Sequence, residues 1–119
     1  MNILVAEDDK VLSRMLCGVL QEGGHICLPA YDAMQTFMYA MKQPPDLILL
    51  DVNMPGGSGI GVLQKLKGSS KTSAIPVLVL SGSIDPALPK QVVELGAVRY
   101  LAKPVDPDVL TKAVAEAIR

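Results

Sequence analysis

Four short apolar runs constrain the fold of this chain more than any other feature, because each ends abruptly in polar residues. The runs are 3–6, 47–50, 77–80 and 100–102, and they are followed by Glu7-Asp8-Asp9, Asp51, Ser81 and Lys103 respectively. An uninterrupted apolar run of this length is typical of a strand buried on both faces of a parallel sheet. The carboxyl ends of parallel strands share one edge of the sheet, so these polar residues are expected to converge there.

Helical patterns alternate with the apolar runs along the whole chain. The expected strands cover residues 2–6, 25–30, 46–50, 75–80 and 98–102. The expected helices cover 10–22, the stretch from the N-cap Asp32 to before Pro44, 59–67, the stretch from near Pro89 to before Gly96, and the stretch from the N-cap Asp106. This alternation predicts one α/β domain over residues 1–119, with a doubly wound parallel sheet of five strands and helices on both faces.

Two details of the helices are also predicted. Asp85-Pro86 offers an attractive helix start, but Pro89 would then lack the N–H that makes the first intrahelical bond. We therefore expect regular helix only from near Pro89. The buried faces are expected to include Leu12, Met15, Leu16, Val19 and Leu20 in the first helix, and Met34, Phe37, Met38 and Met41 in the second.

Composition limits the partners and the compartment of the chain. Half of its 119 residues are apolar and its formal net charge is −1, so it has no general attraction to nucleic acid or to an anionic membrane. Cys17 and Cys27 form no metal-binding or redox motif, and two free thiols in a reduced cytoplasm are the expected state.

The carboxylates at the predicted edge suggest a metal site. Asp8 and Asp9 follow the first strand and Asp51 follows a neighbouring one, so their charges repel one another unless a cation lies between them. Oxygen ligands favour Mg²⁺, with Mn²⁺ as an alternative, and the lack of His or Cys in the cluster argues against zinc. The alternative is a solvated acidic turn, which would suffice for Asp8-Asp9 alone but leaves the convergence with Asp51, Ser81 and Lys103 unexplained.

The same edge carries the groups that phosphoryl transfer requires. An aspartate can attack phosphorus and form an acyl phosphate, which makes Asp51 a candidate nucleophile. Positive charge from a divalent cation and from Lys103 would neutralise the transferred group, and the hydroxyl of Ser81 could donate a hydrogen bond to it.

Taken together, these motifs resemble the receiver domain of two-component response regulators. The resemblance covers the full chain and rests on Asp8-Asp9, the Asp51-Val52-Asn53-Met54-Pro55 segment, Gly59, Ser81-Gly82 and the Tyr100-Leu101-Ala102-Lys103-Pro104 segment. It implies a flavodoxin-like sheet of strand order 2-1-3-4-5. It also implies a cis peptide bond between Lys103 and Pro104.

The resemblance further implies a role for each matching residue. Asp51 would accept the phosphoryl group and Lys103 would bind it. Asp9 would ligate the metal directly, Asp8 largely through water, and the backbone carbonyl of Asn53 would complete the site together with Asp51. Ser81 and Tyr100 would form a switch pair, and Gly82 would leave the phosphoryl group accessible.

The implied function is phosphoacceptor signalling rather than catalysis on an outside substrate. The donor would be a sensor histidine kinase or a histidine phosphotransfer protein. The output would be a downstream protein or effector domain bound through the helix after Pro89, the last strand and the last helix, with phosphorylation-dependent dimerisation as a further option. The sequence leaves open whether the receiver stands alone or belongs to a larger regulator.

Two other functions compete with this one. A phosphohydrolase with an Asp nucleophile would carry a second Asp two positions later as general acid, but that position holds Asn53. A degenerate receiver that binds partners without phosphate would be expected to lack Asp51, Lys103 or the acidic pair, all of which are present.

Overall fold

The computed structural model describes residues 1–54 and 58–118, and its five strands form one parallel sheet of order β2-β1-β3-β4-β5. The elements, in chain order, are β1 Asn2–Ala6, α1 Lys10–Glu22, β2 Ile26–Ala30, α2 Ala33–Lys42, β3 Leu47–Asp51, α3 Gly59–Gly68, β4 Val77–Ser81, α4 Leu88–Glu94, β5 Arg99–Ala102 and α5 Pro107–Ile118. This confirms the expected fold class and the strand order that the resemblance implies. Residues 55–57 of the expected turn after Asp51 lie outside the described residues.

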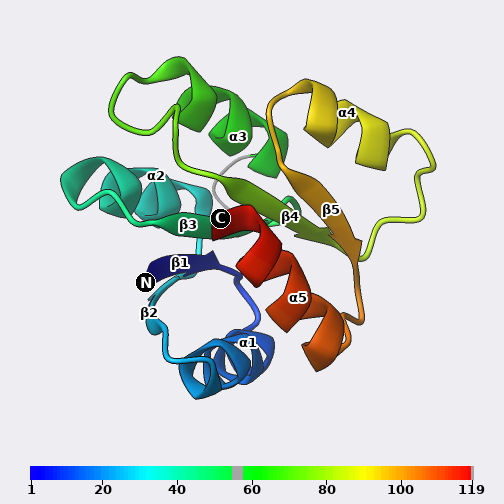
Figure 1. Ribbon diagram of the computed structural model, residues 1–119. Coiled ribbons are helices and arrows are strands. Elements are labelled where there is room, and N and C mark those ends of the chain that lie inside the picture. Colours follow the sequence, from blue (N-terminus) through cyan, green and yellow to red (C-terminus); the bar gives the residue numbers. More distant parts are fainter. Residues whose placement is uncertain (55–57, 119) are drawn as a thin grey trace.

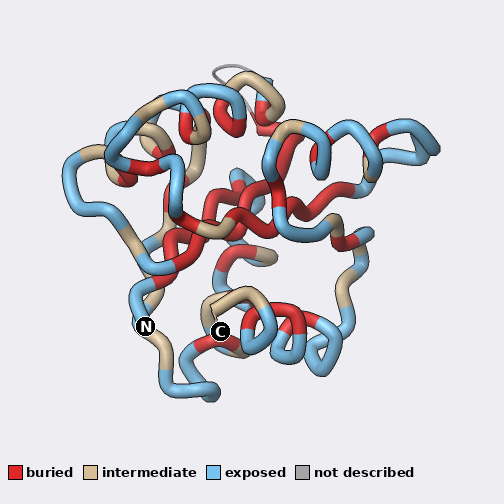
Figure 2. The backbone as a smooth tube through the Cα atoms, turned by 45° about the horizontal axis from the view of Figure 1, so that its top comes forward, coloured by how far each residue is buried: buried red, intermediate tan, exposed pale blue. Residues whose placement is uncertain are grey.

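Helices cover both faces of the sheet, with α1 and α5 on one side and α2, α3 and α4 on the other (Figure 1). Successive strand residues point to opposite faces, so each face has its own apolar core. Ile3, Val5, Leu49 and Leu80 belong to the core that includes α1 and α5, whereas Leu4, Leu50 and Val79 belong to the core under the other helices. β3 and β4 are therefore buried along their whole length, and β1 is buried from Ile3 onward (Figure 2).

Side-chain caps fix where the helices begin. Asp32 accepts a hydrogen bond from the Gln35 N–H at 2.7 Å, and Asp106 accepts one from the Asp108 N–H at 2.8 Å. These bonds satisfy backbone donors that have no intrahelical partner, which is why a short polar side chain before an apolar helix marks its start. Both predicted N-caps are confirmed.

The boundary of α4 and the cis peptide also agree with the predictions. The helix runs from Leu88 to Glu94, and Pro86 lies in the preceding turn. Asp85 caps that turn instead, accepting a hydrogen bond from the Ala87 N–H at 2.9 Å. The Lys103–Pro104 peptide bond is cis.

The predicted burial of several methionines is wrong. Met15 is 63% exposed, Met34 is 68% exposed and Met38 is 57% exposed. The face of α2 that meets the sheet is formed by Ala33, Thr36 and Ala40, all buried. Because these small side chains let the helix lie close to the strands, the larger methionines on the neighbouring arc of the helix face outward.

Gly59, the first residue of α3, lies too close to the end of β3 to carry a side chain. A Cβ atom there would lie 2.2 Å from the Cα of Val52. The clash is with backbone, so it cannot be relieved by rotating a side chain. We expect Gly59→Ala to lower the free energy of unfolding by about 3 kcal/mol.

Chemical denaturation should show this loss, with Gly61→Ala as the matched control. A Cβ atom at Gly61 would meet only the Cβ of Ser58, at 3.9 Å, so alanine there should stabilise the helix by up to about 1 kcal/mol. Equal midpoints and slopes for the two variants would contradict the close approach of α3 to Val52.

Candidate functional site

Four strand ends build the site at the carboxyl edge of the sheet. Ala6 of β1 pairs with Leu50 of β3, which places Glu7 beside Asp51 where both strands end. Ser81 ends β4 and pairs with Ala102, so Lys103 follows on the next strand. Glu7, Asp51 and Ser81 are each at most 1% exposed. The sheet therefore holds two carboxyl groups and a hydroxyl in a region that is almost closed to solvent.

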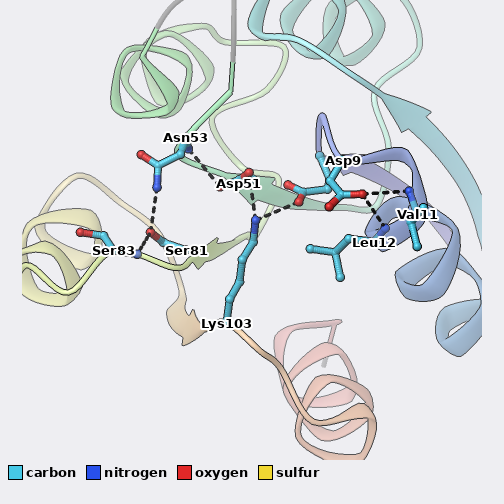
Figure 3. A network of polar contacts seen from close by, with 9 residues as sticks. Asp9, Val11, Leu12, Asp51, Asn53, Ser81, Ser83 and Lys103 are labelled. Atoms are coloured by element: carbon cyan, nitrogen blue, oxygen red, sulfur yellow. Dashed lines mark hydrogen bonds and ion pairs between the residues drawn. The ribbon is translucent and has the colours of Figure 1, made fainter.

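Lys103 joins the two buried carboxyl groups. Its Nζ lies 2.8 Å from Oε1 of Glu7 and 3.2 Å from Oδ2 of Asp51. The side chain is 24% exposed, so it closes the site from the solvent side. The ammonium points directly at the Asp51 carboxylate (Figure 3).

Burial and mutual repulsion change the protonation of this group. Burial, together with the neighbouring Asp51 carboxyl group, raises the pKa of Glu7 to about 8, against the lowering effect of Lys103. Burial alone would lower the pKa of Lys103, but the hydrogen bond to Glu7 and the charge of Asp51 outweigh it, so that pKa is raised. The site therefore keeps its ammonium charged and holds one carboxyl proton near neutral pH.

Carboxylate oxygens at this edge form a group that could hold a metal ion. Among the described residues, Glu7, Asp8 and Asp51 bring one oxygen each to within 4.8 Å of one another. Within residues 1–54 and 58–118, Oε2 of Glu7 is buried and has no hydrogen-bond partner, so one oxygen beside the group is unsatisfied. Clustered hard oxygens with an open side suit Mg²⁺ or Mn²⁺.

Asp9 does not lie in this group, which corrects the assignment of Asp9 as the direct metal ligand. Its Oδ1 accepts hydrogen bonds from the N–H groups of Val11 and Leu12, at 3.0 and 3.1 Å, and so caps α1 (Figure 3). The strand ends at Ala6 and the helix begins at Lys10, so Asp9 occupies the N-cap position. Glu7 was not predicted to be a site residue. It directly follows β1, however, much as Asp51 ends β3.

Asp51 and Ser81 are linked by Asn53. Its backbone N–H donates to Oδ1 of Asp51 at 3.0 Å, and its side-chain Nδ2 donates to Oγ of Ser81 at 3.3 Å. Ser81 Oγ also accepts from the N–H of Ser83 at 3.0 Å. A hydroxyl has two acceptor positions and one donor hydrogen, so these bonds leave the O–H of Ser81 free to donate elsewhere.

The sequence matches the response regulator receiver domain over residues 3–115. The chain belongs to this family. It is 36% identical to the phosphate regulon transcriptional regulatory protein PhoB of Escherichia coli over 118 residues, which cover 99% of this chain and 52% of PhoB. It is 30% identical to sporulation initiation phosphotransferase F of Bacillus subtilis, over 95% of this chain and 90% of that protein.

Solved receiver structures agree with the fold. The chemotaxis response regulator CheY4 of Vibrio cholerae superimposes with a TM-score of 0.90 at 27% sequence identity, covering 98% of this chain and 97% of CheY4. The receiver spans about half the length of the phosphate regulon regulators that it matches. None of the helices in the described part of the receiver is long and apolar enough to cross a membrane.

The second residue of the expected switch pair lies on the α4 side of the receiver. Tyr100 is partly buried and packs against the core that includes Leu88 and Val92 of α4. Tyr100 is two residues before Ala102, so their side chains face the same side of the sheet. Ala102 is the register partner of Ser81. The structure thus places Tyr100 next to α4, while its coupling to Ser81 stays a prediction.

Proposed function

We propose that this receiver accepts a phosphoryl group from a phosphohistidine donor onto Asp51, with Mg²⁺ or Mn²⁺ bound, in the cytoplasm. The observation that carries the proposal is the position of Asp51, a buried carboxylate with Lys103 Nζ at 3.2 Å and two further carboxyl groups beside it. Lys103 supplies one cation next to this buried aspartate, and a bound metal ion would supply a second.

The transfer step uses one oxygen of Asp51 as nucleophile. That oxygen attacks phosphorus, the phosphorus–nitrogen bond of the donor breaks, and its electron pair returns to the imidazole ring. The N–H of Asn53 holds Oδ1 at 3.0 Å, which fixes the plane of the carboxylate during the attack. Lys103, already directed at Oδ2, neutralises charge on the transferred group.

Asp8, Asp51 and the backbone carbonyl of Asn53 would hold the metal ion, with Glu7 beside them. A bound divalent cation supplies positive charge that screens the carboxylates from one another and from the incoming phosphoryl group. Glu7, which already contacts Lys103 at 2.8 Å, keeps the ammonium positioned next to Asp51 when the metal is absent.

The switch follows from the hydrogen-bonding capacity of Ser81. Its free O–H can donate to an oxygen of a phosphoryl group on Asp51, and moving toward that oxygen would weaken the 3.3 Å bond from Asn53. Tyr100 would then enter the space that Ser81 leaves, which favours one state of a two-state equilibrium. The responding surface would be α4, β5 and α5.

The partners follow from this cycle. A sensor histidine kinase or a histidine phosphotransfer protein would supply the phosphoryl group, and a downstream protein or effector domain would bind the α4, β5 and α5 surface, with dimerisation as one form of output. The receiver would not catalyse reactions of other substrates. The general acid of an Asp-based phosphohydrolase would sit where Asn53 is, and an amide cannot donate that proton.

Intact-mass spectrometry with acetyl phosphate as donor tests the proposal. In Mg²⁺ the mass should rise by one phosphoryl group, and hydroxylamine, which cleaves acyl phosphates, should remove it. The same incubation in EDTA should leave the mass unchanged. Labelling that persists in EDTA, or that resists hydroxylamine, would show that the phosphoryl group is not on a metal-assisted aspartate.

A further inference from the structure

Two cysteines that are distant from the phosphoacceptor site lie against each other. Cys17 is in α1 and Cys27 is in β2, ten positions later, and both thiols are free and half-buried. Sγ of Cys27 lies 3.8 Å from the carbonyl oxygen of Cys17. Both side chains pack at the border of the core shared by α1 and α5. We propose that Cys17 and Cys27 are an oxidation site, forming a reversible disulfide that ties α1 to β2 when the receiver meets a peroxide.

The two thiols differ in reactivity. The neighbouring thiol of Cys27, together with the hydroxyl of Ser13, lowers the pKa of Cys17 to about 7, against the opposing effect of burial. The neighbouring Cys17 thiol, together with burial, raises the pKa of Cys27. Because the thiolate is the reactive form, Cys17 is the sulfur that reacts with the oxidant and Cys27 is the resolving thiol.

The chemistry proceeds in two balanced steps. The Cys17 thiolate attacks one oxygen of hydrogen peroxide, the oxygen–oxygen bond breaks, and the departing hydroxide takes up a proton to become water, leaving a sulfenic acid on Cys17. The sulfur of Cys27 then attacks the sulfur of Cys17, and the sulfur–oxygen bond breaks. The departing hydroxide takes the proton of the Cys27 thiol, so the thiols lose two electrons and peroxide becomes two waters.

Because of where the two cysteines lie, the disulfide would join α1 covalently to β2. β2 is an edge strand of the sheet and pairs with β1, and Cys27 lies opposite Ile3 near the amino end of β1. The segment between the two cysteines contains the turn at Gly23 and Gly24, where Gly24 has φ of +88°. A covalent link across that turn restricts the unfolded chain more than the folded one. The inference does not depend on phosphorylation of Asp51.

Peroxide treatment of the full chain, followed by N-ethylmaleimide and intact-mass measurement, tests the inference. The expected product has lost two hydrogens and carries no maleimide, and peptide mapping should find one linked pair that contains Cys17 and Cys27. Dithiothreitol should restore two reactive thiols. The oxidised form should melt at a temperature higher by about 5 °C or more.

Single variants separate the two roles and supply the control. In Cys27→Ser, dimedone should trap a sulfenic acid on Cys17, whereas Cys17→Ser should react with peroxide far more slowly. The result that would overturn the inference is a wild-type chain that still binds two maleimides under conditions in which Cys27→Ser is trapped by dimedone. Oxidation only to disulfide-linked dimers would overturn it equally.

Discussion

Replacing Asp51 by Asn should abolish phosphorylation of this receiver by acetyl phosphate while leaving the fold intact. The asparagine side chain has the same shape and can still accept the hydrogen bond that Asn53 donates to Oδ1 at 3.0 Å, but its amide nitrogen is not a nucleophile. The substitution also removes one negative charge from the group formed with Glu7 and Asp8, which offsets the lost ion pair with Lys103, so the metal-free variant should stay close to the wild type in stability. Intact mass in Mg²⁺ and acetyl phosphate measures the first effect, and a thermal melt in EDTA measures the second.

Asp9→Asn is the matched control for that experiment. Asparagine caps a helix as well as aspartate does, so the hydrogen bonds to Val11 and Leu12 should survive and phosphorylation should proceed. The pair of variants therefore separates an acidic residue of the site from an acidic residue of the adjacent helix cap. Loss of labelling in Asp9→Asn would show that Asp9 takes part in the metal site. Labelling of Asp51→Asn equal to that of the wild type would show that Asp51 is not the phosphoacceptor.

Much of this fold could be read from the sequence because the strongest signals are local. Apolar runs such as 47–50 can satisfy their burial only inside a parallel sheet covered on both faces, and caps such as Asp32 and Asp106 fix helix starts by their own hydrogen bonds. The boundary of α4 followed from the missing N–H of Pro89 alone. These features depend on a few neighbouring residues and not on the final packing.

The errors arose where tertiary packing chooses between two local patterns. In α2 the series Met34, Met38 and Met41 has helical spacing, but so do Ala33, Thr36 and Ala40, and only the approach of the helix to the sheet decides which series is buried. In the acidic run after β1, the N-cap rule applied to a helix starting at Lys10 identifies Asp9 as the cap. Applying that rule would have left Glu7 and Asp8 for the site.

The meeting of Cys17 and Cys27 had no signal in the sequence at all. A separation of ten positions matches no metal or redox spacing, and the contact exists only because α1 packs against β2. Side chains at the strand ends were different, because the topology alone sends them to one edge. Chemistry that depends on strand ends is therefore predictable from sequence, whereas chemistry between a helix and a strand requires the structure.

Replacing Lys103 by Met should slow phosphorylation at least about 10-fold and destabilise the metal-free receiver. Methionine keeps the length of the apolar stem but removes the ammonium that lies 2.8 Å from Glu7 and 3.2 Å from Asp51. Two nearly inaccessible carboxyl groups would then lie beside each other with no cation between them, and each would lose a charge-assisted hydrogen bond. Leaving such buried groups unsatisfied should lower the free energy of unfolding by about 1–3 kcal/mol.

Lys90→Met provides the comparison, since Lys90 is also a lysine with a carboxylate partner. Its Nζ is 3.9 Å from Glu94, and the two side chains are 84% and 64% exposed, so solvent screens the pair and its removal should change stability by no more than about 0.5 kcal/mol. Denaturant unfolding in EDTA and labelling rates in Mg²⁺ should be measured for both variants. If Lys103→Met is labelled at the wild-type rate and unfolds at the wild-type midpoint, the ammonium neither supports the transfer nor holds the carboxyl groups together. A loss of stability with an unchanged rate would assign Lys103 a structural role alone, because burial of Glu7 and Asp51 requires the cation whether or not the phosphoryl group does.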